Sequence, residues 1–134
     1  MDYSKVSGQV LSGIVAASRA RDAAHDACEQ ELSASFPQDV RQLYDVWRAD
    51  TGASDIAGQI IKAAHAKMGT IDVFELGKLD HDNLAASLRI MHVCAMPGLL
   101  SDRGLTVAPD GTQLLTERQV QDLLRDTHVS ELML

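Results

Sequence analysis

The sequence has 134 residues, of which 46% are hydrophobic and 23% charged, and its formal net charge at pH 7 is −7. A chain of this length fits one domain and can bury a core without a disulfide framework or a structural metal. No stretch concentrates Lys or Arg, which disfavours a nucleic-acid partner, and no run is apolar enough to span a bilayer.

Aromatic residues make up only 4% of the chain, while alanine and leucine are abundant. This balance favours packed helices over a β-sandwich, which would need more β-branched and aromatic residues. Cys28 and Cys94 are the only cysteines and form no CxxC motif. A reduced, cytoplasmic setting is therefore expected, although the sequence leaves open whether the two cysteines meet.

The first predicted element is a helix from about Asp2 to Leu32. Its apolar or small residues recur every three or four positions, which is the spacing of one helix face. They are Val6, Val10, Gly13, Ala17, Ala20, Ala24 and Ala27. Small side chains on this face would allow a neighbouring helix to approach closely.

The segment Ser35-Phe36-Pro37 predicts a break, since proline suits the first turn of a new helix. A second, amphipathic helix then ends near Thr51-Gly52, with Phe36, Val40, Leu43, Tyr44 and Trp47 on one side. A third helix is predicted from an N-cap at Ser54 to a glycine stop at Gly69.

The segment TIDVFEL (70–76) permits either a short strand or a helical turn. Asp80 or Asp82 can cap a fourth helix that runs to about Met96 and ends at Pro97-Gly98. Because this helix is apolar nearly all round, we predict that it lies centrally in the core.

The last third contains two short apolar runs around Pro-Asp-Gly, which predict a β-hairpin over about 105–115. Residues 116–119 form a capping box for a final helix to about Asp126. The predicted fold is thus mainly α: a single domain over 1–134, a bundle of four or five helices with one short hairpin before the last helix. Residues 1–98 form the helical bundle, and residues 99–134 form the hairpin plus C-terminal helix. The expected core is Val10, Val40, Leu43, Trp47, Ile60, Leu84, Leu88, Met91 and Leu123.

The stretch KLDHDNLAASLRIMHVCAM (78–96) gathers soft and polar side chains that could bind a metal. Helical geometry separates most of them, because His92 and Cys94 lie about 200° apart around the axis. His81 and His92 share a face but lie roughly 16 Å apart along the axis, so only His92 and Met96 could act together. Elsewhere, only His25 and Cys28 form such a pair. Each pair is half a ligand shell at most, and we predict neither a metal site nor a cofactor.

The segment AAHAKMGT (63–70) resembles the motif of histidine phosphotransfer domains, which are four-helix bundles. The resemblance implies that His65 accepts phosphate. Gly69 fits the family pattern, whereas Lys67 is one position early for its lysine and Met68 stands in that place.

The segment SDRGLTVAPDGTQLLTERQVQDLL (101–124) resembles the wing of winged-helix transcription regulators, and LAASL (84–88) resembles the first helix of their helix-turn-helix. The resemblance implies a DNA-binding regulator with a recognition helix over about 92–102. Pro97-Gly98 interrupts that region, which departs from the family pattern.

No GxSxG, GxGxxG, GK[ST] loop or HExxH motif indicates an enzyme. We therefore predict a non-enzymatic intracellular protein-binding or regulatory protein, such as an adaptor, an inhibitor or a chaperone-like regulator. A protein partner or self-association could use the apolar tail residues Leu132, Met133 and Leu134.

Overall fold

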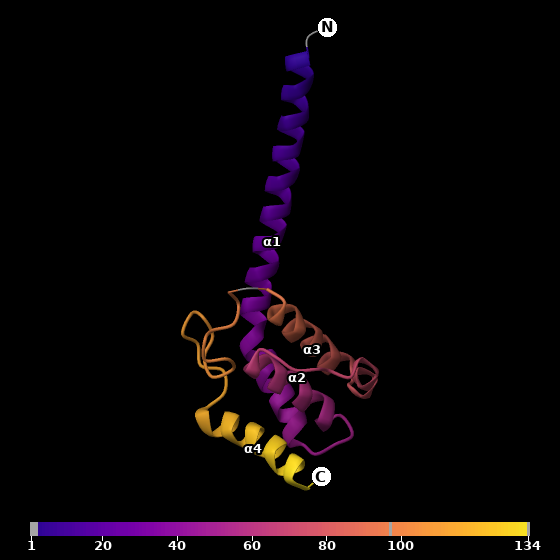
Figure 1. Cartoon of the computed structure of the whole chain (residues 1–134), viewed down its shortest axis with the longest axis vertical. Helices are drawn as coiled ribbons and strands as arrows, with labels where there is room; N and C mark the ends of the chain where they lie inside the picture. Colours follow the sequence, from indigo (N-terminus) through magenta and orange to yellow (C-terminus); the bar gives the residue numbers. More distant parts are fainter. Residues whose placement is uncertain (1–2, 97, 134) are drawn as a thin grey trace. The chain divides into compact units, whose positions relative to one another are not determined.

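The structure is a computed structural model that describes the backbone of residues 3–96 and 98–133, and side-chain burial for residues 10–96 and 98–125. Within these residues the elements are α1 (Tyr3–Arg48), α2 (Ser54–Ala66), the 3-10 helix η1 (Val73–Lys78), α3 (His81–Cys94) and α4 (Glu117–Met133) (Figure 1). The predicted mainly helical fold is confirmed.

Contacts divide the chain into two compact units, Met1–Glu31 and Leu32–Leu134. Among the described residues, every buried hydrophobic side chain belongs to the second unit, from Leu32 onward. In the first unit, all side chains from residue 10 to residue 27 are exposed. The prediction of one domain over 1–134 is not tested by this division and stays a prediction.

The predicted break at Ser35-Phe36-Pro37 is wrong, because α1 continues through Pro37 to Arg48. A proline inside a helix costs about 3 kcal/mol through a lost hydrogen bond and a steric clash. Phe36 and Val40 flank Pro37 and are 3% and 0% exposed. Burial of two such side chains contributes about 3–6 kcal/mol, enough to offset the proline and keep the helix continuous.

Helix α2 is the central element of the second unit, because it packs against α3, α4 and η1. Its buried side chains include Ile56, Ile60 and Ile61, each at most 1% exposed. α1 also approaches α2 closely, since a Cβ at Gly58 would lie 2.8 Å from Trp47 Cδ1. The glycine thus permits the contact between the two helices.

The prediction that the helix around 80–96 lies centrally in the core is wrong. On α3 only Ala86, Ser87, Ile90 and Val93 are buried, which is one face of the helix. Leu88 is 52% exposed and Cys94 is exposed as well. Two polar contacts join α3 to α1: Arg89 forms a bidentate ion pair with the buried Asp39, and Gln42 Nε2 donates to Asn83 Oδ1 at 2.7 Å.

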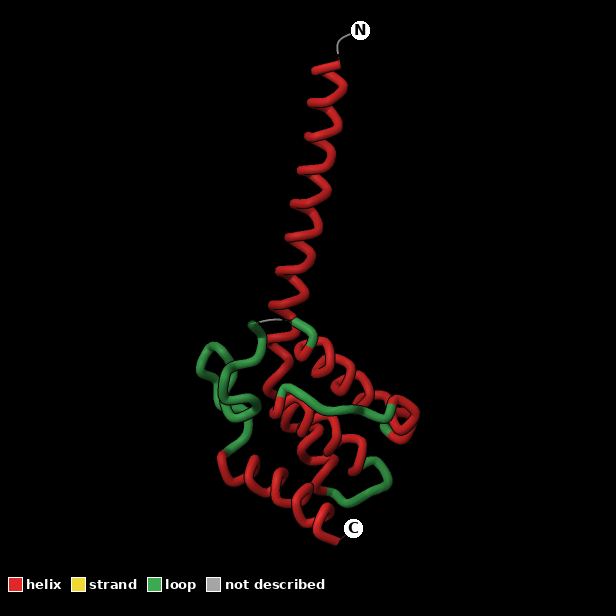
Figure 2. The backbone as a smooth tube through the Cα atoms, viewed as in Figure 1, coloured by secondary structure: helices red, strands yellow, loops and turns green. Residues whose placement is uncertain are grey.

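The predicted hairpin over 105–115 is wrong: the described residues of this segment form one isolated bridge, between Val107 and Gln113, and Figure 2 draws the segment as loop. Side chains alternate between two faces along a strand, so consecutive residues are not both directed into one core. Leu114 and Leu115 are nevertheless 5% and 0% exposed. The segment is therefore an irregular loop anchored in the core by Leu105, Leu114 and Leu115.

Several predicted helix ends are confirmed. Asp80 caps α3 by accepting from Asn83 N at 2.8 Å. Thr116 and Gln119 form the predicted reciprocal capping box at the start of α4, with distances of 2.9 and 3.1 Å.

Two other predicted helix ends are wrong. Ser54 is not the N-cap of α2, because that position is Ala53. α4 runs to Met133, past the predicted end at Asp126.

The residues 70–76, for which the sequence permitted strand or helix, lead into η1, and Asp72 accepts from Phe74 N at 3.1 Å to cap it.

Of the predicted core, four residues are buried: Val40, Leu43, Ile60 and Leu123. Trp47, Leu84 and Met91 are only partly buried. The prediction is wrong for Val10 and Leu88, which are 56% and 52% exposed.

Candidate functional site

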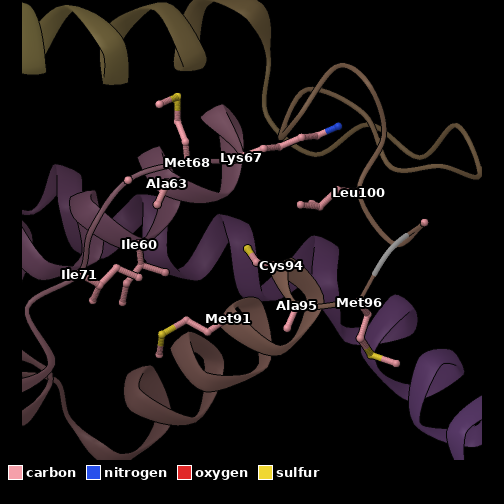
Figure 3. Close-up of a pocket in the computed structure, with 12 residues that line it drawn as sticks. Ile60, Ala63, Lys67, Met68, Ile71, Met91, Cys94, Ala95, Met96 and Leu100 are labelled. Carbon is pink, nitrogen blue, oxygen red and sulfur yellow. The ribbon is translucent and has the colours of Figure 1, made fainter.

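An apolar cavity of about 540 Å³ opens between α2, α3 and the loop that follows α3 (Figure 3). It is a groove rather than a closed chamber, because several of the residues that line it are exposed to solvent. The lining consists of Ile60, Ala63, Lys67, Met68, Gly69, Ile71, Met91, Cys94, Ala95, Met96, Gly98 and Leu100. We refer to this set as the apolar groove.

Helical spacing explains how each wall of the groove forms. On α2 and its C-cap, Ile60, Ala63 and Lys67 follow each other at i, i+3 and i+7, and so lie on one face. On α3, Met91 and Cys94 are three residues apart, with Ala95 next to Cys94 at the C-cap. Each helix therefore contributes one continuous strip to the groove.

The turn after α2 completes one end of the groove. Lys67 has φ 58° and Gly69 has φ 130°, so the chain leaves the helix through left-handed conformations. A Cβ at Gly69 would lie 3.5 Å from Ala63 Cβ, which brings this turn close to the α2 wall. Met68, between them, is 75% exposed and forms part of the rim.

The groove has few side chains that could take part in catalysis. Lys67 is the only charged residue that lines it, and Cys94 is its only thiol. Cys94 is exposed as a residue, but desolvation raises the pKa of its thiol, so the thiol is protonated at neutral pH. A protonated thiol is a poor nucleophile and a poor metal ligand. The groove is therefore suited to binding an apolar surface.

The soft residues of the stretch 78–96 thus line a groove wall, and the structure does not bring them together as ligands. Met91, Cys94 and Met96 line the groove, whereas His81 and His92 are exposed and do not. Among the residues that the structure describes, no three His, Cys, Asp or Glu side chains come close enough to hold a metal ion.

His65 is held in a structural contact. Its Nδ1 accepts a hydrogen bond from Leu105 N at 3.1 Å, and a Cβ at Gly104 would lie 2.6 Å from this same nitrogen. Desolvation lowers the pKa of His65, which keeps the ring neutral and able to accept. One ring nitrogen is thus used to fix the loop at residues 104–105 onto α2, which weakens the argument for His65 as a phosphoacceptor.

The winged-helix resemblance implies a recognition helix and a β-wing, and the described residues contain neither of them at the expected positions. α3 ends at Cys94, so it does not extend over 92–102, and the wing segment is a loop within the described residues. Arg103, the cation that this region could offer to phosphates, lies 3.5 Å from Glu117.

No helix in the described part of the chain has the length and hydrophobicity that crossing a membrane requires.

The other predicted site residues lie apart from the groove. His25 Nε2 lies 2.9 Å from Glu29 Oε1, and Cys28 is a half-buried free thiol in the same unit. The side chains of Leu132 and Met133, and all of Leu134, fall outside the described residues, so the predicted tail site is not placed.

Sequence reasoning missed the groove, because its walls come from segments about thirty residues apart. One signal was present: Met68, Met91 and Met96 are three of the five methionines in the chain, and all three line this one groove. No protein-family model, curated protein or solved structure matches the chain.

Proposed function

We propose that the chain is a non-enzymatic, intracellular protein-binding module whose apolar groove receives the apolar face of a partner helix. The observation that carries this proposal is the concentration of three methionines in an open apolar groove. Methionine is flexible and polarisable, and it is over-represented on surfaces that adapt to helical partners.

The shape of the groove favours a helix over a small molecule. Small-molecule sites enclose most of the ligand surface. Here Lys67, Met68 and Ala95 are exposed at the rim, which leaves one side of any occupant in water. A helix that buries one apolar face and keeps its polar face in solvent fits this arrangement, and an extended strand has no sheet edge to join within the described residues.

The charge of the rim adds to the description of the partner. Lys67 is the only charged residue of the lining, and its side chain extends from the end of α2 toward the loop that carries Leu100 (Figure 3). An acidic residue placed one or two turns from the apolar anchors of the partner helix could pair with it. We therefore propose an amphipathic helix with large apolar anchors and an acidic flank, as an adaptor or inhibitor would recognise.

Native co-purification with matched variants tests this function. Met91→Glu places a charge in the groove wall, and Leu88→Glu places the same charge on an exposed site of the same helix outside the groove. We expect the protein that co-purifies with the wild type to be lost with Met91→Glu and retained with Leu88→Glu.

A second variant separates lost binding from lost folding. Ala95→Trp fills the groove from an exposed position without adding charge, so the fold should tolerate it. It should also lose the partner while its thermal unfolding stays that of the wild type. Retention of the partner by both groove variants would rule the groove out as its binding site.

A further inference from the structure

The loop after α3 forms one wall of the apolar groove and is held onto α2 by His65. Gly98 and Leu100 of this loop line the groove (Figure 3). A few residues further on, Leu105 N donates to His65 Nδ1 at 3.1 Å. We refer to this hydrogen bond, together with the packing of Gly104 against the ring, as the loop latch. The latch lies beside the groove and not in it, since His65 is not one of the lining residues.

A short turn connects the loop latch to the groove wall. Gly104 N donates to Ser101 O at 3.2 Å, and these two residues form an isolated bridge. Ser101 Oγ also donates to Val107 O at 2.6 Å, which fixes the turn to the chain that follows it. Leu100 directly precedes this turn. Because the turn is closed by its own hydrogen bonds, a displacement of Gly104 should carry Leu100 with it.

The loop latch depends on the protonation state of His65. Nδ1 can accept from Leu105 N only while it carries no proton, because an imidazolium ring donates from both nitrogens. Protonation would set two N–H groups against each other across a distance of 3.1 Å. A Cβ at Gly104 would lie 2.6 Å from the same Nδ1, so the loop backbone packs directly against the nitrogen that gains the proton. A proton on His65 should therefore push residues 104–105 away from α2.

Burial is what lowers the pKa of His65. On α2 and on the segment from the loop to α4, the charged residues nearest to the latch along the chain are Lys62, Lys67, Asp102, Arg103, Glu117 and Arg118. Arg103 and Glu117 lie 3.5 Å from each other. Desolvation lowers the pKa of His65, and no carboxylate among the described residues offsets this effect. The ring is therefore neutral near pH 7 and gains its proton only as the pH falls below 6.5.

We infer that the loop latch is a pH-sensitive control of the apolar groove: protonation of His65 releases residues 104–105 from α2 and displaces Leu100 from the groove wall. The inference rests on the proposed function, to which it adds regulation of the same site. The latched state favours the neutral ring, so the latch is closed at neutral pH and opens as the pH falls. The groove should accordingly hold its partner at neutral pH and release it in mild acid.

Nuclear magnetic resonance of the full chain between pH 8 and pH 5 tests the loop latch without any partner. The probes are the His65 ring, the Leu105 amide and the Leu100 methyl groups, with the buried Ile56 of α2 as the reference for an intact fold. We expect the first three to change together with one midpoint below 6.5, while Ile56 stays unchanged. A Leu105 amide that does not follow His65, or a Leu100 that stays fixed while Leu105 moves, would overturn the inference.

Two substitutions separate protonation of His65 from other effects of pH. His65→Asn keeps an oxygen close to the position of Nδ1, where it can accept from Leu105 N, but it gains no proton in this range. Leu105 and Leu100 should then keep their pH 8 signals throughout. His92→Asn removes an exposed histidine of α3 that does not line the groove, and it should leave the titration unchanged. A transition that persists in His65→Asn would show that another group moves the loop, against the proposal.

Native co-purification at pH 7.5 and pH 5.5 tests whether the latch controls the groove. We expect about tenfold less of the groove partner from the wild type at the lower pH, and equal recovery at both with His65→Asn. Equal recovery from the wild type would show that the latch does not control binding. If no partner is recovered at pH 7.5, the proposed function fails, whereas the resonance titration still decides whether His65 moves the groove wall.

Discussion

At the scale of single residues, the fold depends on close contacts that the sequence pattern does not show. Gly58 lies against the Trp47 ring, and Gly104 lies against His65. In both cases a glycine faces a ring side chain that belongs to another element. The two glycines are therefore constrained by tertiary packing.

Gly58→Ala should destabilise the protein. Alanine favours a helix by about 1 kcal/mol over glycine, but overpacking a core contact costs about 1–3 kcal/mol. Here the new Cβ would lie 2.8 Å from Trp47 Cδ1, so the steric cost should exceed the gain, for a net loss of about 1 kcal/mol. Urea denaturation measures this loss. Gly52→Ala is the control, because nothing lies within 4 Å of its Cβ and little change is expected.

His65 should make stability depend on pH near neutrality. Desolvation lowers its pKa below the ordinary value of 6.5, so the unfolded chain binds a proton more readily than the folded protein does. The contribution of the neutral His65 ring to the free energy of unfolding is therefore fully present above about pH 7.5 and is lost as the pH falls through 6.5 and below. Urea midpoints between pH 5 and pH 8 should show this loss, and His65→Gln should flatten it. An unchanged pH profile in the variant would show that His65 is not the titrating group.

At the scale of elements, the ion pairs between segments differ widely in how much they should contribute to the free energy of unfolding. Asp39 on α1 has a side chain only 4% exposed, and its carboxylate receives both Arg89 Nε and Nη2 from α3 at 2.9 and 2.8 Å. Arg103 and Glu117 are instead largely exposed and 3.5 Å apart. Only the first pair should contribute measurably.

Arg89→Met should destabilise the second unit by about 2 kcal/mol, because it leaves the Asp39 carboxylate buried without its partner. Breaking a fully buried pair costs about 3–5 kcal/mol. Since Arg89 is 43% exposed, water can reach part of this site and the loss should be smaller. Arg103→Met, at the exposed pair, should change the unfolding free energy by less than about 1 kcal/mol. Equal losses in the two variants would show that burial of Asp39 does not matter.

Local signals in the sequence predicted helix type and several helix ends, because capping depends on neighbouring residues. Asp80 and the Thr116–Gln119 box were predictable for this reason. The continuation of α1 through Pro37 was not, because it depends on the burial of Phe36 and Val40 in the core. The groove was missed for the same reason: its methionines line one surface only after α2 and α3 have packed.

At the scale of the whole molecule, the hydrophobic core and the exposed apolar patch lie in different units. The buried hydrophobic residues of the described chain begin at Leu32, and the exposed patch lies within residues 10–15. The stability of the second unit should therefore not depend on the first.

A fragment comprising residues 32–134 should fold, because it retains every buried hydrophobic side chain of the described residues. Its thermal unfolding should be cooperative, with a midpoint close to that of the full-length protein. Circular dichroism at increasing temperature measures both. A fragment that shows no cooperative transition would mean that residues 1–31 stabilise the second unit directly.

Site-specific photo-crosslinking in cells tests the central claim most directly, namely that the apolar groove binds a protein partner. A photoreactive amino acid at Met68, on the exposed rim, would be compared with the same group at Leu88, which is exposed but outside the groove. We predict a discrete covalent adduct from position 68, absent from position 88 and abolished by Ala95→Trp. Equal adducts from both positions, or none from position 68, would contradict the claim.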